Sequence, residues 1–94
     1  MTVVSVQKIV LDVLKPHQPN ALDFSRAIAA AGDDYCVHLT VIEVDESTET
    51  IQIVITGKAI DFDAVEAAIR DLGGSVHSID EVEVQSGDEA AGAP

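Results

Sequence analysis

Apolar and polar residues along the first half of the chain follow a pattern that predicts strand, helix and strand. Residues 6–14 are almost all apolar, which is typical of a central strand covered on both faces. Residues 21–32 carry apolar side chains at helical spacing, and Asn20 is placed to cap that helix. Residues 35–44 alternate apolar and polar side chains as a strand does, and the polar residues 45–48 form a turn.

The same pattern returns in the second half of the chain. Residues 49–56 predict a strand that forms a hairpin with the previous one, with isoleucine at alternate positions. Asp61 caps a second amphipathic helix, and the pair Gly73 and Gly74 ends it. Residues 75–84 predict a last strand with a bulge near Asp80, because the apolar positions change parity there.

This β-α-β-β-α-β order predicts a ferredoxin-like α+β fold. Two right-handed β-α-β units give a four-stranded antiparallel sheet in the order 4-1-3-2, with both helices on one face. Residues 1–84 form this single domain, and the small, polar residues 85–94 form a flexible acidic tail. Cys36 is the only cysteine, so an iron–sulfur cluster is not implied, and its place in a strand predicts a buried, inert thiol.

The charge balance narrows the classes of partner. The chain has 94 residues, with 17 acidic and 5 basic side chains and a formal net charge of -12. Phosphate binding needs clustered lysine and arginine, so we expect neither nucleic acid nor an anionic membrane surface as a partner.

An excess of carboxylates with few lysines and much alanine is typical of proteins from a salt-rich cytoplasm, where salt screens the repulsion. The alternative is that the charge serves solubility alone. The segment Met1–Val4 shows no basic region followed by a long apolar run, which predicts a cytoplasmic protein.

Strand parity assigns a set of side chains to the sheet face that the helices leave uncovered. The set is Val10, Asp12, Leu14, Cys36, His38, Thr40, Ile42, Val44, Val54, Thr56, His77 and Ile79. Because an exposed apolar patch usually marks an interface, we expect a homo-oligomer. The expected interface residues are Val10, Leu14, His38, Ile42, Val54 and His77. The two edge strands could also join subunits into a ring. The alternative is that register changes or long side chains hide the patch.

Four polar side chains are candidate metal ligands: Asp12, His17, His77 and Asp80. The last strand runs antiparallel beside the first, which places His77 near Asp12. The two could form an ion pair, or share a divalent cation with His17 or Asp80. Oxygen ligands of this kind suit calcium or magnesium as well as zinc. The alternative is a structural Asp–His pair that stabilises the sheet or an interface.

His38 and His77 occupy matching positions in the two halves of the chain. They lie on opposite edges of the predicted sheet, so one subunit cannot bring them together, whereas a ring built edge to edge could. The alternative is two unrelated strand histidines. The sequence shows no nucleophile elbow, phosphate-binding loop, dinucleotide fingerprint or zinc-knuckle spacing, so catalysis has no support from motifs.

Several segments in the same order resemble a small archaeal family. They are Ile9–His17, Glu43–Thr50, Ile60–Phe62 and Gly73–Val82. Together they resemble the archaeal domain-of-unknown-function family 211. The resemblance implies an archaeal source, a ferredoxin-like fold and ring-shaped homo-oligomers. It implies no established biochemical activity.

Two classes of function therefore stay open. The first is a non-enzymatic, ring-forming module that binds a ligand or an ion, or regulates a partner. The second is a metal-dependent enzyme with a site around Asp12, His17 and His77. A purely structural adaptor belongs with the first class, because the sequence does not separate the two.

Overall fold

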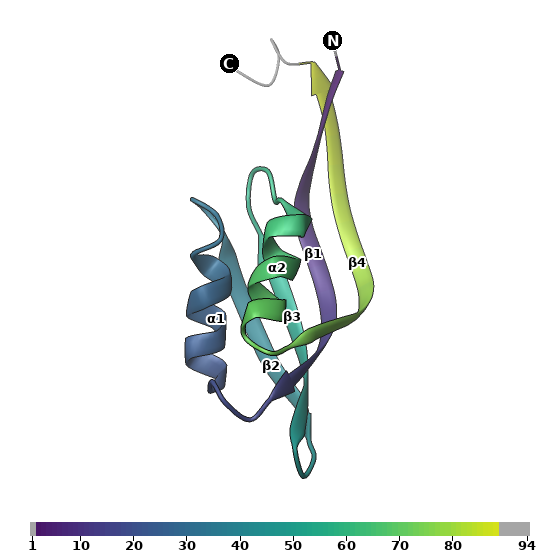
Figure 1. The fold of residues 1–94 in the computed structure, drawn as a ribbon. Coiled ribbons are helices and arrows are strands. Elements are labelled where there is room, and N and C mark those ends of the chain that lie inside the picture. The colour runs from purple at the N-terminus through teal and green to yellow at the C-terminus, as the bar shows by residue number, and fades with distance from the viewer. Residues whose placement is uncertain (1, 89–94) are drawn as a thin grey trace.

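The structure is a computed structural model that describes residues 2–88. Its elements are β1 (Thr2–Pro16), α1 (Ala21–Ala29), β2 (Cys36–Val44), β3 (Thr48–Thr56), α2 (Phe62–Asp71) and β4 (Ser75–Asp88). They form an antiparallel sheet in the order β2-β3-β1-β4, and both helices lie on the same side of it (Figure 1). The predicted ferredoxin-like fold is confirmed. We call the two sides of the sheet the helix face and the open face.

The core forms where alternate residues of the two central strands meet the apolar stripes of the helices. β1 and β3 pair without interruption from Lys8 opposite Thr56 to Pro16 opposite Thr48, and residues directly opposite share a face. Burial of each aliphatic or aromatic side chain there contributes roughly 1.5–3 kcal/mol. The buried set is Ile9, Leu11, Val13, Phe24, Ile28, Ile51, Ile53, Ile55, Val65 and Ile69.

Side-chain caps begin both helices as the sequence predicts. Asn20 Oδ1 accepts a hydrogen bond from the Asp23 amide at 2.8 Å, and Asp61 Oδ1 accepts one from the Ala64 amide at 3.2 Å. Each cap satisfies one of the backbone donors that a helix leaves free at its first turn.

A tight turn connects α2 to β4. Gly73 has a φ of 86°, in the left-handed region that favours glycine, and the Gly74 amide donates to Ile69 O at 2.9 Å. A Cβ on Gly74 would lie 3.2 Å from Leu14 O. Glycine therefore lets the chain pass close to the end of β1, and the β1–β4 pairing begins at once with Ser75 opposite Leu14.

A bulge in β2 moves one apolar side chain to the other face. The pairing of β2 with β3 skips Ile42, so Val44 lies opposite Glu49. Glu49 in turn lies opposite Lys15, whose neighbours at alternate positions of β1 form the core. Val44 is therefore on the helix face, which corrects its predicted place on the open face.

β4 carries two bulges, each of which leaves one residue without a partner in β1. One lies at Asp80 and confirms the change of parity read from the sequence, whereas the other lies at His77 and was not predicted. Ile79 falls between them and pairs with Leu11, so it too lies on the helix face rather than on the predicted open face.

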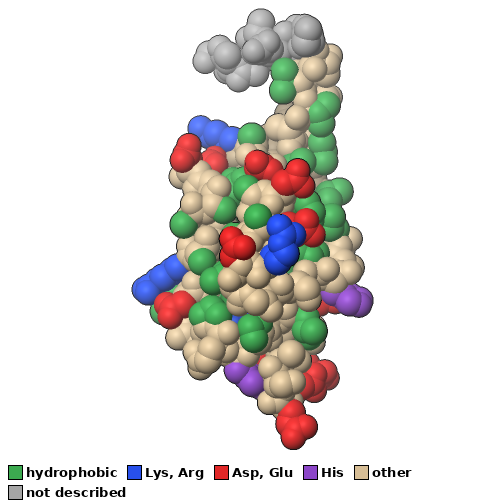
Figure 2. Space-filling view, viewed as in Figure 1, with side chains coloured by type: hydrophobic (Ala, Val, Ile, Leu, Met, Phe, Trp, Pro, Cys, Tyr) green, Lys and Arg blue, Asp and Glu red, His purple; other side chains and the backbone are tan. Residues whose placement is uncertain are grey.

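These bulges leave exposed aliphatic side chains along both outer edges of the helix face. The β2 strip consists of Val41 and Val44, which are 42% and 63% exposed. The β4 strip consists of Ile79, Val82 and Val84, each at least half exposed. Figure 2 shows hydrophobic side chains along the β4 margin of the molecule, beyond the cover of the helices.

β1 and β4 extend together past the rest of the sheet. The sequence predicted a strand from residue 6 and a tail from residue 85, but Thr2–Ser5 pair with Gln85–Asp88. Each segment provides the ladder partner that the other needs, so both become strand (Figure 1). The rest of the predicted tail, residues 89–94, lies outside the described residues. The described structure is accordingly long and narrow, 51 × 22 × 17 Å.

The open face is more polar than predicted. Thr40, Gln52, Asp12 and Ser78 lie opposite one another in one row across all four strands. Cys36 on this face is exposed, which corrects its predicted burial. Only scattered aliphatic side chains remain accessible between these polar groups.

Candidate functional site

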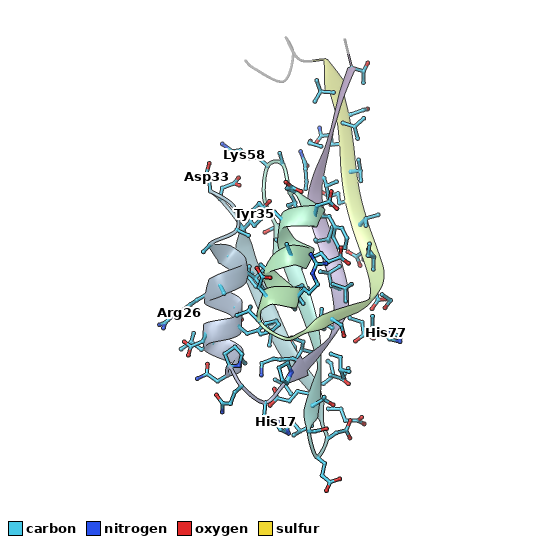
Figure 3. The ribbon with its side chains drawn as sticks, viewed as in Figure 1. His17, Arg26, Asp33, Tyr35, Lys58 and His77 are labelled. Atoms are coloured by element: carbon cyan, nitrogen blue, oxygen red, sulfur yellow. The ribbon has the colours of Figure 1, made fainter. Side chains whose placement is uncertain are left out.

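Ionisable side chains gather at two places, one on each face of the sheet. The Lys15 cluster, made of Lys15, His17 and Glu49, lies at the helix-face end of β1 and β3. The Asp12–His77 pair lies on the open face, between β1 and β4. His17 and His77 are labelled in Figure 3 and belong to separate parts of the molecule.

The Asp12–His77 pair has the proximity that the sequence predicts. His77 Nδ1 lies 3.4 Å from Asp12 Oδ2, and the two side chains are 78% and 33% exposed. The bulge leaves His77 without a partner, between the Asp12–Ser78 and Val13–Val76 pairs. Without the bulge, His77 would lie opposite Val13 on the helix face. A depression of about 170 Å³ is lined by Asp12, Val13, Leu14, Thr50 and His77. The pair therefore offers one imidazole nitrogen and one carboxylate oxygen beside open space.

The other two predicted metal ligands do not join this pair. Asp80 Oδ1 accepts a 2.6 Å hydrogen bond from Ser78 Oγ. Within residues 2–88, no group of three or more His, Cys, Asp and Glu side chains is placed to hold a metal ion. The described chain thus brings together two of the four predicted ligands.

Lys15 is the only charged side chain of the described residues that is fully buried. Its Nζ donates to Pro16 O at 2.8 Å, to Glu49 Oε1 at 3.2 Å and to His17 O at 3.4 Å. It also lies 5.8 Å from the centroid of the Phe24 ring. A buried ammonium is costly unless its protons are all bonded and a counter-charge is near. The arrangement around Lys15 meets both conditions, which indicates a structural ion pair.

His17 is held by an acceptor at each ring nitrogen. Its Nδ1 lies 3.0 Å from Glu49 Oε2, and its Nε2 lies 3.0 Å from Glu46 O in the turn between β2 and β3. Two acceptors need two ring N–H groups, so the imidazolium form fits this geometry. The hydrogen bond to Glu49, followed by that to Glu46 O, raises the pKa of His17 above its ordinary value.

The pKa of Glu49 is shifted in the opposite direction to that of His17. The hydrogen bond from His17, followed by that from Lys15, lowers the pKa of the Glu49 carboxyl. Because Glu49 is on the helix face, His17 is engaged on the side of the sheet away from Asp12. His17 therefore clamps the β2–β3 turn to the end of β1.

Sequence reasoning placed Lys15 in a loop and gave Glu49 no role. The signal that identifies them is strand parity: Lys15 continues the series Ile9, Leu11, Val13, and Glu49 precedes Ile51 at the same spacing. Two opposite charges at the ends of two buried series predict a buried pair.

The predicted interface residues differ in how accessible they are. Val10 is 7% exposed and already shielded within one chain, and Val54 is half-buried. The exposed members are Leu14, His38, Ile42 and His77. Among the described residues, neither helix has both the length and the apolar character needed to cross a bilayer.

Comparisons with known proteins agree with the motifs noted above. A protein-family model for DUF211, described as "Uncharacterized ArCR", matches residues 7–89. The chain is also 42% identical over 77 residues to "Uncharacterized protein MJ0319" of Methanocaldococcus jannaschii. This match covers 82% of the present chain and 79% of the relative. The chain therefore belongs to domain-of-unknown-function family 211.

Proposed function

We propose that this protein is a self-assembling module in which copies join through the outer edges of their sheets and close into a ring. The observation that carries the proposal is the presence of exposed aliphatic strips on the helix face of both edge strands. In a chain with a net charge of -12, such strips are out of keeping with an isolated subunit.

The strand directions support head-to-tail joining. Neighbouring strands alternate in direction across the order β2-β3-β1-β4, so β2 and β4 run in opposite directions. The outer edge of β4 in one copy can thus pair antiparallel with the outer edge of β2 in the next, and both pairs of helices stay on the same side. A heterologous contact of this kind repeats until the rotation closes.

Joining at an unchanged level would also extend the rows of the core. The row Leu39, Ile53, Leu11 and Ile79 is aliphatic on the helix face of all four strands. The adjoining row ends in Val82 on β4 and in Val37 on β2. Burying these side chains against the next copy would remove apolar area from water at both edges.

An archaeal source with a salt-rich cytoplasm belongs to the same proposal. A ring of many copies multiplies the acidic charge of each chain, and concentrated salt screens that repulsion. The family match and the archaeal relative support the source, and the carboxylate excess supports the salt.

Sedimentation velocity in concentrated potassium chloride tests the assembly. We expect a single species several times the mass of one chain. Replacing Ile79 and Val82 together by serine should shift it to monomer, because both side chains line the β4 edge. Leu22→Ser is the matched control, since Leu22 is 59% exposed but lies on α1. A wild-type monomer, or equal loss of assembly in the control, would contradict the proposal.

A metal-dependent enzyme is the second candidate, and the Asp12–His77 contact favours it. The version that includes His17 has less support, because both nitrogens of that ring are bonded to Glu49 and Glu46. Incubating the protein with a divalent metal and a set of chromogenic esters would reveal hydrolysis. Activity that Asp12→Asn abolishes would favour the enzyme over the passive module.

A further inference from the structure

The Asp12–His77 pair has the chemistry of a metal site but only part of its ligands. A stable transition-metal site needs three or four converging donors, and the pair supplies two. Both side chains border an open depression on the open face, and neither ring nitrogen nor carboxylate is enclosed. A further donor would therefore have to come from outside this part of the chain.

His38 is the other histidine on the open face. It lies on β2, opposite Val54, which in turn lies opposite Val10 on β1. The Val10 row and the Asp12 row are neighbours, two residues or about 7 Å apart along the strands. His38 is exposed and sits at the far edge of the sheet from His77, so one copy cannot bring the two together.

Edge-to-edge assembly removes that separation. When β2 of the next copy lies beside β4 at an unchanged level, its His38 falls beside Glu81, and His77 lies four residues away along β4. Because bulges take up two of these four residues, the offset is about 8 Å along the strands and one strand spacing of about 5 Å across them, which two imidazoles that converge on one metal ion can span. The Asp80 carboxylate on the same stretch of β4 adds negative charge, which favours a cation there, whereas Glu81 is already paired with Lys8.

We infer that assembly completes a transition-metal site from Asp12 and His77 of one copy and His38 of the next, an inference that rests on the proposed ring. Two imidazoles and one carboxylate with an open position suit zinc and related divalent metals. Calcium prefers six to eight oxygen ligands, so this donor set selects against it. Each ring would hold one metal ion at each interface between copies.

Equilibrium dialysis against Zn²⁺ alone, followed by elemental analysis, tests the inference. We expect one zinc per chain in the assembled protein. His38→Ala, His77→Ala and Asp12→Asn should each weaken binding at least about tenfold. All three side chains are partly or fully exposed, so these variants should fold. His17→Gln is the matched control, because it also removes a histidine but should leave zinc binding unchanged.

Mixing two variants tests whether the ligands come from different copies. In rings assembled from equal amounts of His38→Ala and His77→Ala chains, about a quarter of the interfaces would regain both histidines. Zinc binding should therefore return to about a quarter of the wild-type level. A site made within one chain would give no return on mixing, and that result would overturn the inference.

The remaining outcomes separate this inference from the proposed ring. Assembled protein that binds no zinc overturns the metal site and leaves the ring standing. Monomeric protein overturns both. Calcium uptake in place of zinc, or zinc uptake that survives loss of His38, overturns the assignment of this donor set.

Discussion

His17 and His77 each lie beside a carboxylate on the same sheet, yet their surroundings differ. His17 has an acceptor at both ring nitrogens, and its partner Glu49 also binds the fully buried Lys15. His77 touches Asp12 through one nitrogen at 3.4 Å and is 78% exposed.

The difference follows from what covers each face. On the helix face, α1 places Phe24 near Lys15, so charge there must be paired within the chain. On the open face nothing within the described chain covers the Asp12–His77 pair, so its polar atoms stay accessible to a ligand. Enclosure makes the first cluster structural, and exposure makes the second a candidate site.

Lys15 gives the largest expected effect on this comparison. Lys15→Ala removes a buried side chain and leaves the Glu49 carboxylate with one partner fewer, so we expect a loss of about 2–5 kcal/mol in unfolding free energy. Lys15→Met keeps the volume and should lose less. Urea denaturation measures both.

Lys8→Ala is the matched control for that experiment. Lys8 is also on β1 and pairs with a glutamate, Glu81, at 2.7 Å, but the two side chains are 34% and 58% exposed. An exposed pair of this kind contributes little. Equal losses for Lys8→Ala and Lys15→Ala would show that burial does not distinguish the two lysines.

The pH dependence of stability is the next largest expected effect. The pKa of His17 is raised above 6.5, so its contribution is full below that pH and is lost as pH rises through the raised pKa. The pKa of Glu49 is lowered below 4.5, so its contribution is full above that pH and is lost as pH falls through the lowered pKa.

The cluster therefore stabilises the fold most between these two ordinary pKa values. Urea midpoints measured from below the lower value to well above the higher one should form a plateau that falls on the alkaline side. His17→Gln should remove the alkaline fall, whereas His77→Gln should leave it in place. An unchanged profile in His17→Gln would show that another group sets the pH dependence.

Salt should change the stability contributed by the Asp12–His77 pair and by the Lys15 cluster to different extents, and both changes should be smaller than the pH effect. With a net charge of -12, the folded chain should gain stability when potassium chloride is raised from about 0.1 M to 2 M, because the Debye length falls from about 10 Å to a few ångströms. Screening should weaken the exposed Asp12–His77 contact more than the buried Lys15 cluster. Thermal unfolding of wild type and the Lys15 and Asp12 variants across this range measures both effects.

Asp12→Asn gives the smallest expected change in stability. Its contact with His77 is long and solvent-exposed, so we expect a change of less than about 0.5 kcal/mol. The same variant should nevertheless lose metal binding. A large loss of stability would move the Asp12–His77 pair from the candidate sites to the structural contacts.

The helices, their ends and the single strands were predictable because they depend on residues that are close in the sequence. Helix caps at Asn20 and Asp61, the stop at Gly73 and the alternation in β3 depend on residues a few positions apart. The order of elements then left few topologies, and the proximity of Asp12 to His77 followed from strand order alone.

Bulges determined which face of the sheet some side chains of β2 and β4 occupy, and strand alternation alone predicted those faces wrongly. The bulges at Ile42 and His77 moved Val44 and Ile79 to the helix face, and the sequence marks neither as clearly as it marks the one at Asp80. A bulge depends on the fit between two strands, which a single strand does not encode. The aliphatic strips at both edges therefore became visible only in the structure.

By itself, the sequence determined the fold, the caps, the acidic character and the closeness of Asp12 and His77. The tertiary structure decided that Lys15, His17 and Glu49 form one enclosed cluster and that His17 is separated from Asp12. The reason is that alternation along a strand specifies two faces, whereas the pairing register and the helices determine what covers each face.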